Sequence, residues 1–203
     1  MKKIVPLSVM LALASPMVMA HEEGDFFMRG GLASVMPNES SDNVLNTGEL
    51  ELTNDMQVGV TFTYMMTDNV GIELLAATPF THDVSTNGLG KIAEVSHLPP
   101  TLMGQYYFGE ADSKYRPYLG AGLNYTTFFE EKGFGALNNT EVELDDSFGL
   151  AVQAGIDVEV NEDWFLNASL WYMDIDTEVK TTVGTFDAEI DPYVVMIGMG
   201  YTF

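Results

Sequence analysis

The sequence predicts an all-β fold, an eight-stranded antiparallel transmembrane β-barrel of the bacterial outer membrane. Three observations predict it: an export signal at the start, eight segments of alternating apolar and polar residues, and connections that alternate between short and long. Alternation with period two indicates strands. Short periplasmic turns and longer extracellular loops are typical of outer-membrane barrels.

The chain opens MKKIVPLSVMLALASPMVMA, which has the order of a secretory signal peptide. Lys2 and Lys3 form the charged region, residues 4–18 the apolar region, and Val18-Met19-Ala20 a small-residue cleavage pattern. We therefore expect residues 1–20 to be removed and residues 21–203 to form one barrel domain outside the cytoplasm.

The composition excludes several classes of protein. There is no cysteine, hence no disulfide framework and no thiol chemistry. After the signal, no stretch approaches the 18 consecutive apolar residues of a transmembrane helix. Without Lys2 and Lys3, 6 basic residues remain against 30 acidic ones, a formal net charge of −24. A surface this acidic should repel nucleic acid, so no nucleic-acid partner is expected.

The strands are expected, in order, at residues 26–36, 55–66, 70–80, 95–108, 115–129, 147–160, 164–178 and 186–203. The short connections are residues 67–69, 109–114 and 161–163, and the longer polar ones are 37–54, 81–94, 130–146 and 179–185. Segments of about ten residues span a bilayer when they are tilted.

The two faces of each strand differ in size. In segment 147–160, Phe148, Leu150 and Val152 share one side, whereas Gly149 and Ala151 share the other. An eight-stranded barrel has little interior room, so the bulky side must face outward, where only lipid tolerates it. A secreted soluble β-sandwich is the rival interpretation, and this difference in size argues against it.

The end of the chain carries a further signal. The last strand finishes GMGYTF, which resembles the C-terminal signal by which outer-membrane barrels are recognised for insertion. Phe203 would then present this strand to the barrel-assembly machinery. Aromatic residues cluster near the ends of the spans, as in the girdles that meet membrane lipid and lipopolysaccharide.

Side-chain parity predicts what lines the interior, because charged residues within membrane-length strands should face inward. Counting heights from the short turns gives a polar lower layer of Arg29, Gln57, Glu73, Gln105, Tyr118, Asp157 and Glu159. An apolar layer above it comprises Leu75, Met103, Trp171, Met173 and Met196. These residues either simply fill a small barrel or form an apolar chamber over a polar plug, which suits capture of a hydrophobic molecule from outside.

Three prolines fall at similar heights on neighbouring strands: Pro79 on the third, and Pro99 and Pro100 on the fourth. Proline cannot donate to a strand ladder. Either they end the pairing above the bilayer, or they weaken a seam through which a guest leaves sideways into the membrane.

Other chemistry finds little support. His21, His82 and His97 stand in no grouping with serine and aspartate that has motif-level spacing, so no enzyme is predicted. Acids alternate at positions 174–178 and 187–191, where carboxylates could hold a hard cation. A solvated acidic rim explains them more simply, so no metal site and no cofactor is expected.

Long runs of the chain resemble the outer membrane protein W (OmpW) family, in order and over essentially the whole mature length. They include FFMRGG, TFTYMMTDNVGIELLAATPF, HLPPTLMGQYYFG, YRPYLGAGLNYTTFF, DWFLNASLWYMDID and IDPYVVMIGMGYTF. The resemblance implies an eight-stranded outer-membrane barrel that passes small, mainly hydrophobic molecules.

The resemblance also favours the chamber interpretation, because the arrangement of Leu75 and Trp171 recurs in the family's motifs. The loops at 37–54 and 130–146 match poorly. Two alternatives stay open: a non-transporting structural or receptor barrel, for instance one that binds phage or bacteriocin, and a channel for small polar solutes such as amino acids.

Overall fold

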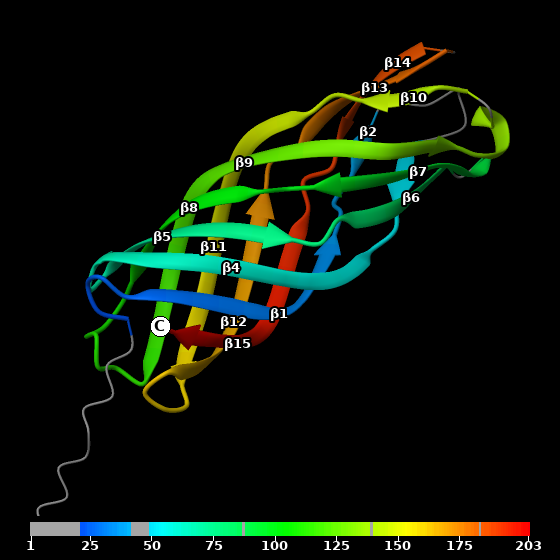
Figure 1. The fold of residues 1–203 in the computed structure, drawn as a ribbon. Coiled ribbons are helices and arrows are strands. Elements are labelled where there is room, and N and C mark those ends of the chain that lie inside the picture. The colour runs from blue at the N-terminus through cyan, green and yellow to red at the C-terminus, as the bar shows by residue number, and fades with distance from the viewer. Residues whose placement is uncertain (1–20, 42–48, 87, 139, 183) are drawn as a thin grey trace, which may run out of the picture.

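The computed structural model describes residues 21–41, 49–86, 88–138, 140–182 and 184–203 (Figure 1). The signal peptide expected at residues 1–20 lies outside the described residues. Among those described, no helix is long and apolar enough to cross a membrane.

Eight antiparallel strands close into a ring, as the alternating sequence predicts. In order around the ring they are β1 (Phe26–Met36), β4 (Asp55–Thr67), β5 (Val70–Ala77), β8 (Thr101–Tyr107), β9 (Tyr115–Gly133), β11 (Ser147–Glu159), β12 (Trp164–Met173) and β15 (Tyr193–Thr202), with β15 pairing back to β1. The three short connections join β4 to β5, β8 to β9 and β11 to β12, as expected.

The strands are strongly tilted. Trp171 on β12 is linked through paired residues on β15 and β1 to Asp55 on β4. In the other direction around the ring, through β11, β9, β8 and β5, the paired residues lead from Trp171 to Met65 on the same strand. The stagger is therefore ten residues for eight strands. A shear of this size gives an interior just wide enough for side chains to fill.

The barrel wall continues well beyond the ring at the end opposite the short turns (Figure 1). There β6 (Phe80–Thr86) and β7 (Gly90–Leu98) form a hairpin that joins β9 and β3 (Leu50–Leu52). A second sheet combines β10 (Val142–Leu144), β13 (Asp176–Thr181), β14 (Gly184–Glu189) and β2 (Ser40–Ser41), and a 3-10 turn, η2, spans Gly135–Leu137.

The expectation that residues 81–94 form a polar loop is therefore wrong. The segment pairs as β6 with β7, and the expected strands 70–80 and 95–108 are each interrupted at their prolines. Alternation continues through this stretch, with buried Phe80, His82 and Val84 on one face of β6. Likewise, the expected strands 164–178 and 186–203 each break into two, at residues 174–175 and 190–192.

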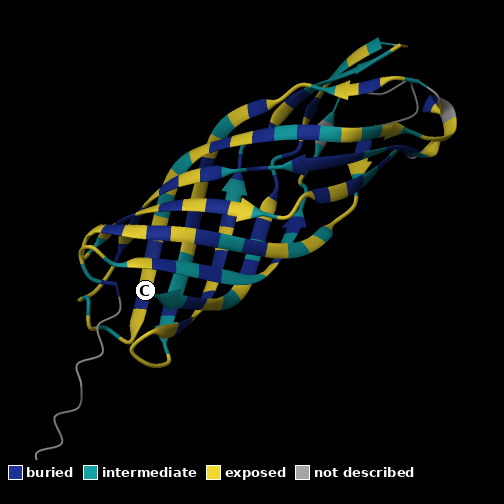
Figure 2. Ribbon diagram, viewed as in Figure 1, coloured by how far each residue is buried: buried dark blue, intermediate teal, exposed yellow. Residues whose placement is uncertain are grey.

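Burial alternates along the ring strands as the sequence predicts (Figure 2). Phe148 is 69% exposed, Leu150 63% and Ile197 66%, whereas their inward neighbours Ala151 and Met196 are 2% and 0% exposed. A broad apolar outer surface over a filled interior is the pattern of a lipid-facing barrel.

Glycines make room for the largest inward rings. A Cβ on Gly155 would lie 2.4 Å from Cζ of Tyr118, and one on Gly200 would lie 2.0 Å from the ring of Phe165. Both glycines lie on a strand directly beside the ring they accommodate. Bulky side chains on one strand are therefore matched by glycine on the next, which lets the narrow lumen close.

Candidate functional site

Arg29 is the centre of a polar plug in the lower half of the lumen. Its Nε and Nη2 donate to both carboxylate oxygens of Asp157 at 3.1 and 2.5 Å, and its Nη1 donates to Glu73 at 2.6 Å. Nη1 also donates to the Thr63 hydroxyl at 3.0 Å, and Nη2 to the Tyr107 hydroxyl at 2.7 Å. The cation and both carboxylates are at most 2% exposed, so the pairs are shielded from water.

Amides extend this network across the barrel. Gln153 donates to Glu73 at 3.0 Å and accepts from Gln105 at 2.8 Å, while Asn167 donates to Asp157 at 2.7 Å and to the Tyr118 hydroxyl at 3.0 Å. The Gln153–Glu73 bond joins β11 to β5, which lie three strands apart around the ring, and the other three bonds join nearer strands. The lower layer is therefore a cross-linked floor.

His21 closes the plug from the periplasmic side. Its Nε2 lies 3.0 Å from Asp157, its ring stacks on Phe27 at 4.0 Å, and its backbone oxygen accepts from Arg116 at 3.4 Å. The His21 side chain is fully buried. The bottom of the lumen is consequently filled from wall to wall.

The structure brings together five of the seven residues predicted for the polar layer, namely Arg29, Glu73, Gln105, Tyr118 and Asp157. The height expected for Gln57 is wrong, because β4 begins at Asp55 at the outer end and Gln57 bonds to Asp55 and Thr78 there. Glu159 lies half-buried at the periplasmic rim, outside the network.

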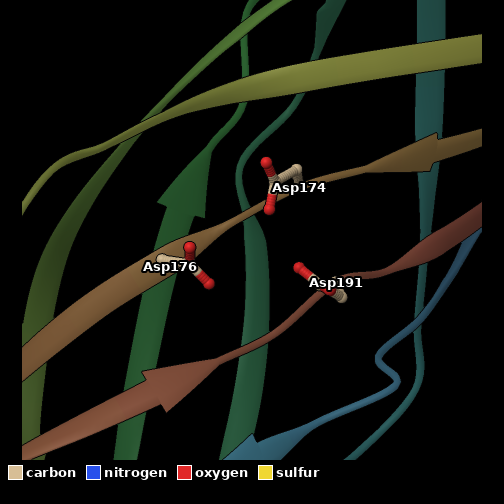
Figure 3. A group of neighbouring side chains, drawn as sticks. All are labelled: Asp174, Asp176 and Asp191. Carbon is tan, nitrogen blue, oxygen red and sulfur yellow. The ribbon is translucent and has the colours of Figure 1, made fainter.

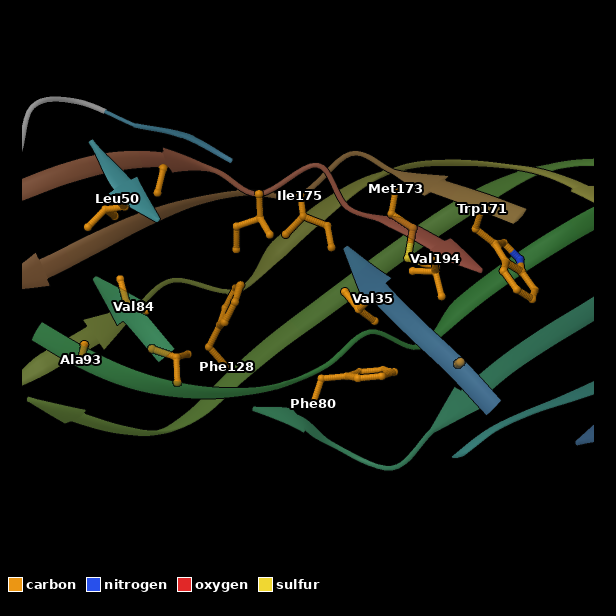
Figure 4. Close-up of a cluster of buried hydrophobic side chains, with 14 of the residues drawn as sticks. Val35, Leu50, Phe80, Val84, Ala93, Phe128, Trp171, Met173, Ile175 and Val194 are labelled. Atoms are coloured by element: carbon orange, nitrogen blue, oxygen red, sulfur yellow. The ribbon is translucent and has the colours of Figure 1, made fainter. Parts of the chain in front are cut away.

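The five residues predicted for the apolar layer lie directly above the plug. Leu75 is 5% exposed, Met103, Trp171 and Met173 are each 1% exposed, and Met196 is fully buried. The indole Nε1 of Trp171 has no hydrogen-bond partner within the described chain. All five belong to one buried hydrophobic cluster (Figure 4).

The same cluster continues upward into a chamber built by the extended wall. Figure 4 shows Trp171 at one end of the cluster and Leu50, Val84 and Ala93 toward the other. The chamber has a cavity volume of about 60 Å³. Its lining comprises mainly aliphatic side chains with Phe128, Phe186, His82 and His97. Many of the lining residues lie in segments expected to be loops, so an apolar chamber was predicted but not its extension this far above the ring.

Two histidines stack on the chamber wall just above the prolines. The ring centroids of His82 and His97 are 5.0 Å apart, and His82 bonds through Nδ1 to the Thr53 carbonyl at 2.5 Å. The outward residues here, such as Thr81 and Asp83, are polar, so this part of the wall stands above the apolar band. Burial lowers the pKa of His97 to about 3 and also lowers the pKa of His82.

The strand pairing is interrupted at the three prolines. β5 pairs with β8 as far as Leu75 opposite Thr101, and pairing resumes with Phe80 opposite His97. No backbone hydrogen bond crosses between residues 76–79 and 98–100, all of which the structure describes. Each side is instead held by its other neighbour, because the amide of Thr78 donates to Val58 on β4 and the carbonyl of Pro100 accepts from Tyr125 on β9.

The acidic repeats meet at the top of the ring. Oxygens of Asp174, Asp176 and Asp191 lie within 4.8 Å of one another (Figure 3). Asp191 accepts from the Tyr172 hydroxyl at 2.7 Å and from the amide of Ile175 at 3.1 Å. Burial, and then the charges of Asp174 and Asp191, raise the pKa of Asp176. The cluster ties the ends of β12 and β15 together.

The polar layer predicted from the sequence omits several members of the plug: His21, Tyr107, Arg116, Gln153 and Asn167. Gln153 and Asn167 had the right parity and were visible as polar residues on inward faces. Tyr107 also shares the inward face of Met103 and Gln105, so parity could have placed it in the plug. His21 and Arg116 gave no signal, because His21 precedes the first strand and Arg116 lies one residue inside a strand end.

A closed, tilted eight-stranded ring, with apolar side chains outside and a polar network inside, defines an outer-membrane β-barrel. Residues 22–203 match the OmpW family, and the chain belongs to that family. It is 53% identical to outer membrane protein W of Vibrio cholerae serotype O1, an alignment that covers 98% of each chain. It is 49% identical to outer membrane protein W of Escherichia coli K12 over the full length of both.

A solved structure supports the same assignment. The crystal structure of the outer membrane protein OprG from Pseudomonas aeruginosa superposes with a TM-score of 0.83 at 42% identity, covering 91% of this chain and 98% of that one. The protein therefore resides in the bacterial outer membrane. Its relatives carry the names of outer-membrane barrel proteins, which points to a barrel channel rather than an enzyme.

Proposed function

We propose that this barrel is a channel for small hydrophobic molecules, which enter the upper chamber from outside and leave sideways into the membrane. The observation that carries the proposal is the continuity of the apolar interior. One buried hydrophobic cluster runs from Leu50 and Val84 in the extended wall down to Trp171 and Met196. An apolar guest can follow this cluster without leaving an apolar environment.

The lower plug argues against straight passage to the periplasm. A solute moving along the axis must separate Arg29 from Asp157 and Glu73, and breaking a buried ion pair is strongly unfavourable. This consideration also disfavours the alternative of a channel for small polar solutes. The proposed exit is the unpaired interval between residues 76–79 and 98–100, where Pro79, Pro99 and Pro100 leave the wall without ladder hydrogen bonds.

Uptake into vesicles with lipopolysaccharide in the outer leaflet tests the proposal. We expect the barrel to accelerate naphthalene uptake and to leave glycine uptake unchanged. Trp171→Ala and Leu75→Ala remove contacts that hold the guest, and each should lower naphthalene uptake several-fold at low concentration. Leu170→Ala is the matched control, because Leu170 is 45% exposed on the lipid side of the same strand.

The receptor alternative predicts a different result. Replacing the exposed Thr185, Asp187 and Glu189 of β14 with alanine should abolish phage or bacteriocin binding if the extended wall is a receptor, yet leave naphthalene uptake intact. Naphthalene uptake no faster than in protein-free vesicles would contradict the channel and favour the structural or receptor role.

We also propose that residues 1–20 direct export and that the strand ending at Phe203 directs assembly. Phe203 is 70% exposed, and its ring lies 5.7 Å from that of Phe26 across the closing pair. N-terminal sequencing of the outer-membrane form should begin at His21. Deleting Phe203 should lower the amount inserted, whereas deleting residues in the β13–β14 turn should not.

A further inference from the structure

The apolar layer contains a hydrogen-bond donor that no acceptor among the described residues satisfies. Trp171 is 1% exposed, and its Nε1 has no acceptor within the part of the chain that the structure describes. Buried donors in folded proteins nearly always have a partner, and each exception needs an explanation. Figure 4 shows the indole at one end of the drawn side chains, beyond Met173 and Val194.

The polar side chains around Trp171 are already committed elsewhere. Ser169, two residues along the same strand, donates to Asn167 at 3.1 Å. Gln153, its pairing neighbour on β11, uses its oxygen for Gln105 and its nitrogen for Glu73. Thr101, at the lower edge of the unpaired interval, donates to the Pro99 carbonyl at 3.0 Å. None of these groups accepts a hydrogen bond from the Trp171 Nε1.

The same position is poorly suited to a water molecule. A buried water needs two to four polar partners. The side chains that form the layer with Trp171 are aliphatic or thioether groups: Leu75, Met103, Met173 and Met196. The indole N–H is thus a polar donor in a layer whose other four members are aliphatic or thioether groups.

We propose that Trp171 selects guests that carry one hydrogen-bond acceptor on an apolar body, such as ketones, esters and aryl ethers. This inference rests on the proposed channel function and names its substrate class. A guest carbonyl satisfies the indole N–H while its hydrocarbon part fills the apolar layer. A second polar group would be buried without a partner, which is unfavourable. An alkane gains the contacts but leaves the donor unpaired.

Indole N–H resonances test this directly, because the chain has only two tryptophans. Trp164 is 43% exposed on the lipid-facing side and serves as the internal control. The barrel in lipid nanodiscs is titrated with acetophenone and, separately, with ethylbenzene, which has nearly the same shape and no acceptor. We expect acetophenone to shift the Trp171 Nε1–H resonance downfield and saturably, with Trp164 unmoved. Ethylbenzene should perturb the layer without a downfield shift of this proton.

Affinity provides the second readout. Trp171→Phe keeps an aromatic ring and deletes the donor, so acetophenone affinity should fall by about two- to tenfold while ethylbenzene affinity stays the same. Thr61→Val is a matched variant, since the buried Thr61 hydroxyl is also without a partner and lies between Arg29 and Leu75 in the pairing. It should leave the acetophenone preference unchanged.

The outcomes separate this inference from the channel proposal. Suppose that both probes bind in the layer, that the Trp171 Nε1–H resonance does not shift downfield, and that Trp171→Phe changes the affinity for both probes equally. The donor role is then wrong and the channel proposal stands. Loss of the acetophenone preference in Thr61→Val, with none in Trp171→Phe, would also overturn it. If neither probe perturbs the layer, both this inference and the channel proposal fail.

Discussion

Arg29 donates its hydrogen bonds to groups inside the lumen. Two carboxylates and two hydroxyls accept from its three nitrogens. Because the ion pairs are at most 2% exposed, removing one charged partner leaves an uncompensated buried charge, which is strongly disfavoured.

Asp157→Ala should therefore lower the free energy of unfolding by about 3–5 kcal/mol. The measurement is urea unfolding in lipid vesicles. Glu159→Ala is the control on the same strand, because Glu159 lies half-buried at the rim outside the plug. If Asp157→Ala lowers the free energy of unfolding no more than Glu159→Ala does, the plug does not contribute this stability.

Gly155 is a second residue whose identity matters. An added Cβ would lie 2.4 Å from the Tyr118 ring, so Gly155→Ala must displace that ring and disturb its bond with Asn167. Overpacking of this kind costs about 1–3 kcal/mol. Gly30→Ala, whose Cβ would meet nothing within 4 Å, should change the same urea midpoint far less. Equal effects would mean that the interior is more adaptable than its packing implies.

At this scale the sequence predicts orientation better than height. Parity assigned Arg29, Glu73 and Trp171 to the interior, because a charge or a small residue on one face marks the whole strand. The layer given to Gln57 was wrong because parity fixes which way a side chain faces and not its height, and Gln57 lies near the outer end of β4, far from the short connection 67–69. His21 was hidden because its partners come from other strands.

At the scale of elements, the wall formed by β5 and β6 against β7 and β8 contains the interruption in strand pairing. Its ladder stops at Leu75 opposite Thr101 and resumes at Phe80 opposite His97. The prolines predicted the interruption of strand pairing. The sequence did not predict the hairpin above them, although Asn87-Gly88 is a dipeptide that favours tight turns. Polar outward residues made the segment resemble a loop.

A cross-link tests whether this wall must part. The hydroxyl oxygens of Thr81 and Ser96 lie 3.0 Å apart just above the prolines, and the native chain has no cysteine. The disulfide of Thr81→Cys/Ser96→Cys should slow naphthalene uptake several-fold, and reduction should restore it. The control disulfide, Ala154→Cys/Leu170→Cys, joins paired residues of β11 and β12 elsewhere in the ring. Uptake indifferent to the first disulfide would rule out exit at this seam.

Acid should weaken the same hairpin. Burial holds the pKa of His97 at about 3, against its ordinary value of 6.5, so the folded hairpin keeps the ring neutral while the unpaired segment takes up a proton. The pairing of β6 with β7 is thus fully favoured above pH 6.5 and is progressively lost as the pH falls toward 3. His82 acts in the same direction, and the charge of Asp55 opposes both shifts.

Hydrogen exchange of the β6 and β7 amides, corrected for intrinsic rates, measures this effect. Protection should fall between pH 6.5 and 4, while the amides of β11 and β12 stay protected. His82→Phe/His97→Phe should remove most of the pH dependence. Protection that is flat in the native protein over this range would contradict the assignment of these histidines as neutral, buried groups.

The whole molecule is a barrel with an apolar upper interior, and the polar plug closes it at the periplasmic end. Its floor is the cross-linked plug around Arg29, its lining is one hydrophobic cluster, and its wall is unpaired beside the prolines. The number of strands, their direction and their faces could be predicted because they follow from local alternation. The height of the wall, the chamber it encloses and the continuity of the cluster could not, since they arise from pairing between segments far apart in the chain.

The central claim is that a hydrophobic guest occupies the lumen above the plug and leaves through the seam. Anomalous diffraction from crystals soaked with a brominated arene, such as 4-bromoacetophenone, tests it most directly. The account predicts bromine density inside the barrel, between the layer of Trp171 and Leu75 and the unpaired residues 76–79 and 98–100. Bromine found only on the lipid-facing surface, or below Arg29, would contradict it.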